Sequence, residues 1–146
     1  MTQVDFHFNV PDKLLYACRL LRKATGRGVP VLVTASDAVL KQLDGLLWSF
    51  SAHDFVPHAT LSDSASVQVA SSILLTETIT DLPHNKALLN LGDTVPPGFD
   101  RFERLIEIVS QDDMQDRQLA RGRWKHYASL GLVPTRHDIA IKETTE

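Results

Sequence analysis

The chain has 146 residues, of which 43% are hydrophobic and 23% are charged, and its formal net charge at pH 7 is −3. This length is enough for one domain that buries a core without disulfides or metals, and the slight negative charge argues against a surface built to neutralise nucleic-acid phosphates. The N-terminal residues lack the basic and then apolar pattern of a signal peptide, and no apolar run is as long as a membrane span, so we expect a cytoplasmic protein without membrane contact.

Strand and helix patterns alternate from the start of the chain. Residues 4–8 alternate between apolar and polar, which predicts a strand with one face in the core. After residue 12, apolar positions recur at helical spacing as far as Gly26, and glycine often follows the end of a helix. The continuous apolar run at 29–33 predicts a strand that is covered on both faces, as in parallel sheets. A second amphipathic helix follows, with a cap at residue 36 or 37.

The remaining chain continues this alternation. We expect an irregular segment over residues 51–66, and then several strands and one long helix. The expected strands lie at 67–70, 73–76, 87–91 and 105–109, with a helical turn at 99–103 before the last of them. Asp112 and Asp113 suit the positive end of the last long helix, which Gly131 and Pro134 end.

Strands and helices at this spacing predict a single α/β domain over residues 1–135 with a mostly parallel central sheet, followed by a polar tail at 136–146. The motifs of nucleotide-binding folds are missing. The first strand leads into Asn9-Val-Pro-Asp12, which has no glycine loop for a phosphate. Gly26-Arg-Gly28 follows a helix, on the wrong side of the element for a phosphate loop. We therefore expect no cofactor.

Other candidate chemistry is weak. Cys18 lies on the apolar side of its helix, where a core residue is a better interpretation than a nucleophile. His53 and His58 flank a loop, but their spacing matches no metal-ligand pattern, so no metal site is expected. Asp81 and Asp93 follow predicted strands, where catalytic carboxylates occur in such folds, and turn chemistry explains them equally well. We expect no catalytic residues.

The last long helix carries the most unusual chemistry. Its face expected to be buried carries Leu119, Ala120, Tyr127 and Leu130. Arg117, Arg121 and Lys125 form a stripe beside that face, with Trp124 at the border. An indole flanked by guanidinium groups can stack an apolar side chain and pair with carboxylates, which suits an acidic peptide with a hydrophobic end. Alternatively, Trp124 completes the core and the arginines pair with neighbouring acids such as Asp113, which contributes little.

Two neighbouring residues of this helix break its pattern. Helical phase places Arg123 in the face that should be buried, where an unpaired charge is costly. We predict that Arg123 meets a carboxylate at the edge of the core or extends to the surface. Gly122 costs about 1 kcal/mol relative to alanine in mid-helix, and the sequence leaves open whether something approaches the backbone there.

Several segments, in this order, resemble the chi subunit family of bacterial DNA polymerase III. They are Leu43-Asp44 with Leu47-Trp48, Phe55-Val-Pro-His58, the strand at 87–91, Glu107-Ile-Val109, and Gln118-Leu-Ala-Arg-Gly-Arg-Trp-Lys-His-Tyr127. The resemblance implies a Rossmann-like three-layer α/β domain without nucleotide and a non-catalytic subunit of the polymerase. It also implies two partners, namely the psi subunit in the clamp-loader assembly and the acidic C-terminal tail of the single-stranded-DNA-binding protein, which ends in Pro-Phe.

The resemblance also assigns residues to the two partners. The tail pocket carries over to Trp48, Arg117, Arg121 and Trp124, with Lys125 as a flank. Arg117 or Arg121 would hold the terminal carboxylate, and the two tryptophans would form walls for the terminal phenylalanine. Trp124 stands where the family more often has tyrosine, so a hydroxyl contact is lost while the apolar wall remains.

The surface for psi is placed on Leu47, Phe55 and Val56. Contact with nucleic acid is then mostly indirect. Two alternatives remain open: a module that binds single-stranded DNA directly, with Trp124 stacked on bases, or a nucleotide-dependent enzyme of the same fold class, with Asp93 acting at the edge of the sheet.

Overall fold

The computed structural model describes residues 2–49, 59–60, 73–79 and 85–139. Its strands form one seven-stranded sheet in the order β3-β4-β2-β5-β6-β1-β7, and every neighbouring pair is parallel. The strands are β1 (Gln3–Val10), β2 (Val31–Thr34), β3 (Ala59–Thr60), β4 (Ile73–Thr76), β5 (Ala87–Asn90), β6 (Arg104–Ser110) and β7 (Thr135–Asp138). The helices are α1 (Lys13–Gly26), α2 (Asp37–Ser49), α4 (Met114–Ser129) and the short η1 (Phe99–Arg101). The predicted α/β class with a parallel sheet is confirmed.

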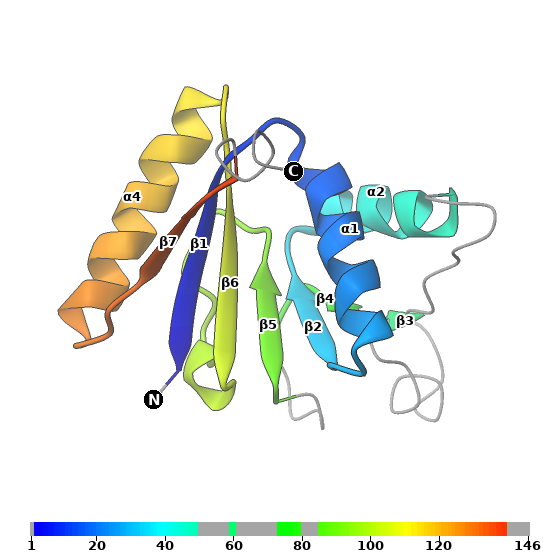
Figure 1. Ribbon diagram of the computed structural model, residues 1–146, viewed down its shortest axis with the longest axis horizontal. Coiled ribbons are helices and arrows are strands. Elements are labelled where there is room, and N and C mark those ends of the chain that lie inside the picture. Colours follow the sequence, from blue (N-terminus) through cyan, green and yellow to red (C-terminus); the bar gives the residue numbers. More distant parts are fainter. Residues whose placement is uncertain (1, 50–58, 61–72, 80–84, 140–146) are drawn as a thin grey trace.

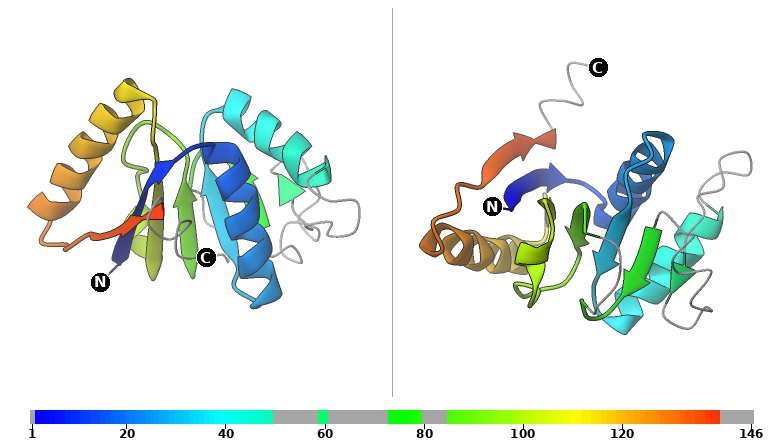
Figure 2. Two further views of the ribbon diagram at one scale, coloured as in Figure 1. Left: turned by 45° about the horizontal axis from the view of Figure 1, so that its top comes forward. Right: turned by 90° about the horizontal axis from the view of Figure 1, so that it is seen from below.

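The helices lie on both faces of the sheet (Figures 1 and 2). Helices α1 and α2 pack on one face over the α1-side core, which includes Cys18, Leu21 and Leu43. Helix α4 packs on the other face over the α4-side core, which includes Phe6 and Tyr127. The predicted three-layer arrangement is therefore confirmed, and the two faces of the sheet offer separate surfaces.

Capping residues fix the ends of the helices where the sequence predicted them. The side chain of Asp12 accepts a hydrogen bond from the backbone N–H of Leu15 at 3.1 Å, at the start of α1. Asp113 does the same for the N–H of Asp116 at 3.2 Å, at the start of α4. Each cap satisfies a backbone donor that has no partner within its own helix. Beyond α4, Gly131 adopts a positive φ of 85°, which glycine does without steric cost.

The C-terminal strand β7 differs from the sequence prediction. Residues 136–138, which were assigned to a polar tail, pair in parallel with β1 at the edge of the sheet. The segment has no apolar alternation because an edge strand with exposed side chains needs none. The two-residue strand β3 likewise falls inside the segment expected to be irregular. The strand expected at 67–70 lies outside the described residues.

A bulge at Asn9 moves the end of β1 from one core to the other. Asn9 has a φ of 62°, and the register of β1 against β6 shifts between His7 and Val10. Phe6 packs in the α4-side core, whereas Val10 packs in the α1-side core, which strict alternation would not allow. Asparagine tolerates the left-handed conformation better than most residues. Asn9 Nδ2 also donates to Asp138 Oδ1 at 3.1 Å, so the bulge helps to hold β7.

None of the helices in the described part of the chain is long and apolar enough to cross a membrane.

We predict that Asn9→Val lowers the free energy of unfolding by about 1–2 kcal/mol or more, because a β-branched residue is strained at positive φ. Asn9→Gly is the matched control, since glycine keeps the backbone conformation and loses only the hydrogen bond to Asp138. Urea denaturation should rank the stabilities as wild type, then Asn9→Gly, then Asn9→Val. Equal losses in the two variants would show that the backbone conformation at residue 9 does not matter.

Candidate functional site: a cation-rimmed pocket beside the last long helix

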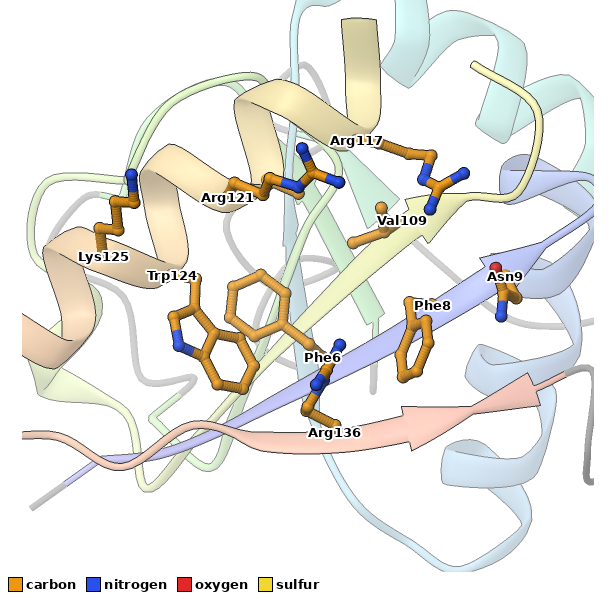
Figure 3. A pocket seen from close by; sticks show the side chains of 10 residues that line it. Phe6, Phe8, Asn9, Val109, Arg117, Arg121, Trp124, Lys125 and Arg136 are labelled. Carbon is orange, nitrogen blue, oxygen red and sulfur yellow. The ribbon is translucent and has the colours of Figure 1, made fainter. Parts of the chain in front are cut away.

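A pocket of about 440 Å³ lies between α4 and the edge of the sheet formed by β1 and β7 (Figure 3). Its lining residues are Phe6, Phe8, Asn9, Val109, Arg117, Ala120, Arg121, Trp124, Lys125 and Arg136. The floor is apolar and largely aromatic, the rim carries cations, and no carboxylate lines it. An occupant should therefore have an apolar group and negative charge close together.

The floor depends on strand alternation and on the position of one indole. Phe6 and Phe8 are two residues apart on β1, so both point to the α4 side of the sheet. The Trp124 ring lies 4.9 Å from the Phe6 ring at an interplanar angle of 53°. Trp124 is only half-buried, so one part of its ring packs on the floor while another part faces the pocket. This matches the expected position of Trp124 at the border of the core.

The cations on α4 recur every four residues, which places Arg117, Arg121 and Lys125 on one side of the helix (Figure 3). Like charges at this spacing destabilise a helix slightly. Arg117 Nη1 donates to the backbone oxygen of Gln111 at 3.5 Å. Among the described residues, no carboxylate pairs with any of the three cations, and Asp113 caps the helix instead of pairing with Arg117. The alternative in which neighbouring acids neutralise the stripe is therefore not observed.

The sequence prediction missed Arg136 and the two phenylalanines of the floor. The Arg136 guanidinium carbon lies 5.2 Å from the centre of the Phe8 ring and 5.9 Å from that of Trp124, so the cation stacks on the floor. Phe6 and Phe8 were expected in the core, and alternation gave no reason to connect them with α4. Arg136 gave no signal, because nothing in its polar neighbourhood indicated a strand.

Neither residue of α2 that was predicted to bind a partner, Trp48 for the tail and Leu47 for psi, lines this pocket. Trp48 is 62% exposed and belongs to α2, which covers the opposite face of the sheet from α4 (Figure 1). Its assignment as a wall of the same pocket is wrong. Leu47 is fully buried in the α1-side core, so its assignment to a partner surface is wrong as well, because the side chain already contributes to the fold. Phe55 and Val56 lie outside the described residues.

A buried ion pair sets the rotation of α4. Arg123 Nε lies 3.1 Å from Glu107 Oε1 on β6, and both side chains are at most 3% exposed. Arg123 Nη1 donates to the Asp93 backbone oxygen at 3.0 Å. The Tyr127 hydroxyl and Asn90 Nδ2 donate to Glu107 Oε2 at 2.6 and 3.0 Å. The prediction that Arg123 meets a carboxylate at the edge of the core is confirmed.

With this ion pair in place, the buried face of α4 differs from the predicted one. With Arg123 and Tyr127 turned inward, Leu119 and Leu130 are left 37% and 52% exposed, although both were expected to be buried. Gly122 is exposed, and nothing lies within 4 Å of where its Cβ would be. No group in the described structure approaches the backbone at Gly122.

Burial raises the pKa values of two members of this network, Glu107 and Tyr127. The pKa of the Glu107 carboxyl is raised by burial, and the charge of Arg123 together with hydrogen bonds from Tyr127, Asn90 and Arg123 offsets only part of that rise. The pKa of Tyr127 is raised, first by burial and then by the adjacent Glu107.

Burial and the charge of Asp12 raise the pKa of Cys18 to about 11, so its thiol stays protonated at neutral pH, as expected for a core residue.

Together, the fold and the pocket define a three-layer α/β protein whose candidate site is a cationic, aromatic-floored pocket on one face of the sheet. The sequence matches the family described as "DNA polymerase III chi subunit, HolC" over residues 1–135. The chain belongs to this family, and the resemblance described above is confirmed.

Two relatives and one solved structure illustrate the match. DNA polymerase III subunit chi of Pseudomonas aeruginosa is 35% identical over 139 residues, covering 90% of this chain and 92% of the relative. The subunit of the same name from Haemophilus influenzae is 30% identical over 116 residues, covering 79% of each chain. The C-terminal domain of the DEAD-box protein Dbp5 superposes with a TM-score of 0.60 at 14% identity, covering 96% of this chain and 91% of that domain. At that identity the likeness to Dbp5 concerns the fold alone.

We predict that Arg123→Met lowers the free energy of unfolding by about 3–5 kcal/mol at neutral pH, because it leaves the Glu107 carboxylate buried without its counter-charge. The double variant Arg123→Met/Glu107→Gln removes both charges and should recover most of this loss. Chemical denaturation of the four members of the double-mutant cycle measures the coupling. Equal stability of the single and double variants would show that the two side chains do not depend on each other.

The loss in Arg123→Met should also depend on pH. Without Arg123, burial acts on Glu107 with less opposition, so the folded-state pKa rises further above the unfolded value. A carboxyl of this kind contributes stability that is present below its unfolded pKa and is lost as pH rises through its folded pKa. The variant should therefore be closest to wild type near about pH 4.5 and furthest from it near about pH 8.

Proposed function

We propose that this chain is a non-catalytic subunit of the polymerase III assembly in DNA replication, and that its α4 pocket binds the acidic C-terminal tail of the single-stranded-DNA-binding protein. The observation that supports this is the pocket itself. It combines an aromatic floor with Arg117, Arg121, Lys125 and Arg136, and no carboxylate of the described residues pairs with these cations. A peptide with acidic residues and a terminal phenylalanine supplies both missing partners.

The proposed binding is a tether of modest strength. A short tail that fills one pocket should bind with micromolar affinity, or about −8 kcal/mol. The single-stranded-DNA-binding protein carries several tails and coats DNA in arrays, as the family resemblance implies. Many weak tails at high local concentration hold a partner for longer than one tail does. The polymerase would thus stay near single-stranded DNA without a direct DNA contact of its own.

The second proposed partner, psi, would use the other side of the molecule. The resemblance places its surface near Phe55 and Val56. Trp48, at the end of α2, exposes 62% of its surface on the same side of the sheet as α1, and exposed tryptophans are frequent anchors of protein interfaces. A psi surface around Trp48 and a tail pocket under α4 would be separated by the sheet, so both partners could bind at once.

We predict that Trp124→Ala and Arg121→Glu each weaken binding of a tail peptide by about 2 kcal/mol or more, because one removes the apolar wall and the other reverses a rim charge. Trp48→Ala is the matched control: it removes an equally large indole from the opposite face and should leave the affinity unchanged. Isothermal titration calorimetry with a synthetic acidic peptide ending in Pro-Phe measures all four proteins. Unchanged affinity in both α4 variants would reject the pocket as the tail site.

We also predict that salt weakens the complex. Between about 0.1 M and about 1 M NaCl the Debye length falls from about 10 Å to about 3 Å, so the exposed rim charges attract the peptide less. Arg121→Gln should show weaker binding at low salt and a smaller dependence on salt than wild type. A single-stranded oligonucleotide titrated under the same conditions tests the alternative, because binding as tight as that of the peptide would favour direct DNA binding.

A further inference from the structure

The pocket has cations on two opposite sides, and they are not equivalent. Arg117, Arg121 and Lys125 project from α4, whereas Arg136 projects from β7 across the apolar floor (Figure 3). Arg136 lies over the rings of Phe8 and Trp124, at 5.2 and 5.9 Å. In the described part of the chain, none of the three α4 cations lies over a ring of the floor. Of the four cations that line the pocket, Arg136 is therefore the one that lies against its aromatic floor.

The negative charges of a peptide that ends in phenylalanine are not equivalent either. The terminal carboxylate is bonded to the same Cα as the benzyl side chain, so it must stay beside the ring wherever the ring binds. Acidic side chains earlier in the peptide lie further from the ring and can reach the outer rim. A guanidinium group binds a carboxylate through two parallel N–H donors, which favours a planar anion held at a fixed position.

Strand β7, which carries Arg136, is held against β1 by backbone pairing and by two side-chain contacts. Residue 136 pairs with Phe6 in the β1–β7 register. The next residue, His137, contacts Asp5 Oδ1 through Nε2 at 3.0 Å. Asp138 accepts a hydrogen bond from Asn9 at 3.1 Å. Because its neighbours are fixed, the backbone of Arg136 is fixed too, and less entropy is lost when its side chain binds an anion.

We propose that Arg136 binds the terminal carboxylate of the acidic peptide, while the α4 cations bind the acidic side chains that precede it. This inference rests on the proposed function of the pocket and adds the direction of the peptide, which runs from the outer side of α4 toward β7. Arg136 is then a specificity-determining residue for a free chain end. It follows the last residue matched by the family, residue 135, and the resemblance had placed the carboxylate on Arg117 or Arg121.

The test compares two synthetic peptides of the same acidic sequence ending in Pro-Phe, one with a free C-terminal carboxylate and one with a C-terminal amide. Each is titrated into wild type, Arg136→Gln, Arg117→Gln and Arg19→Gln, the last being a matched control on α1. Amidation should weaken wild-type binding about tenfold or more. Arg136→Gln should lose about the same factor for the free acid and nothing for the amide. Arg117→Gln should lose an equal factor for both peptides, and Arg19→Gln should lose nothing.

Each other outcome is informative. An equal loss for both peptides in Arg136→Gln would overturn the proposal, because it would place an acidic side chain and not the chain end on Arg136. No loss for either peptide would overturn it as well. If wild type binds neither peptide, the proposed function fails together with this inference. Unchanged binding of the amide shows that the variant is folded, and if Arg136→Gln does not fold, Arg136→Lys should retain amide binding and lose part of the preference for the free acid.

Discussion

The position of α4 depends on one buried ion pair, between Arg123 of the helix and Glu107 of β6. Removing two charges from water costs several kcal/mol for each ion, and only good geometry with complete hydrogen bonding offsets that cost. Here the Tyr127 hydroxyl, the Asn90 amide and the Asp93 carbonyl supply additional partners, although Arg123 Nη2 is buried and has no hydrogen-bond partner among the described residues. With leucine at position 123, the helix could slide or rotate against the sheet with little penalty. The Arg123 guanidinium group must instead stay beside one carboxylate. The pair therefore fixes the helical phase, and the phase decides which residues reach the pocket.

A second polar anchor acts at the start of the helix. Asp116 is held by Lys13 of α1 at 2.9 Å and accepts a hydrogen bond from the backbone N–H of Ser110 at 2.8 Å. Asp116 and Arg123 are seven residues apart, about two turns, so both anchors lie on one side of α4. The next side of the helix carries Arg117 and Arg121, one residue after Asp116 and two before Arg123. The two inward side chains each form an ion pair within the fold, whereas Arg117 and Arg121 pair with no carboxylate of the described residues.

Most of the fold followed from periodicity, because apolar runs, caps and glycine stops report directly on buried faces and helix ends. The grouping of side chains on α4 could also be predicted. Arg117, Arg121, Trp124 and Lys125 share one helix, and their spacing places them near one another. Contacts between segments that are far apart in the sequence could not be predicted. Trp48 was wrongly assigned to the same pocket because sequence order does not show which face of a sheet a helix covers. Arg136 was missed because a short edge strand has no hydrophobic signature. Leu119 was wrongly expected to be buried, because the pattern of apolar residues takes no account of an ion pair that can set the rotation of the helix.

The net charge of −3 favours a short ligand over an extended polyanion at the cationic pocket. A long phosphate backbone would follow the pocket rim and then meet the acidic remainder of the surface, which repels it beyond the first contacts. The proposed peptide end is short enough to interact with the rim alone, and its affinity would come from a few charge-assisted hydrogen bonds and one buried ring. The surrounding negative charge then disfavours extended polyanions more than it disfavours the peptide. The same arrangement limits the strength of binding, which suits a tether that must release and rebind.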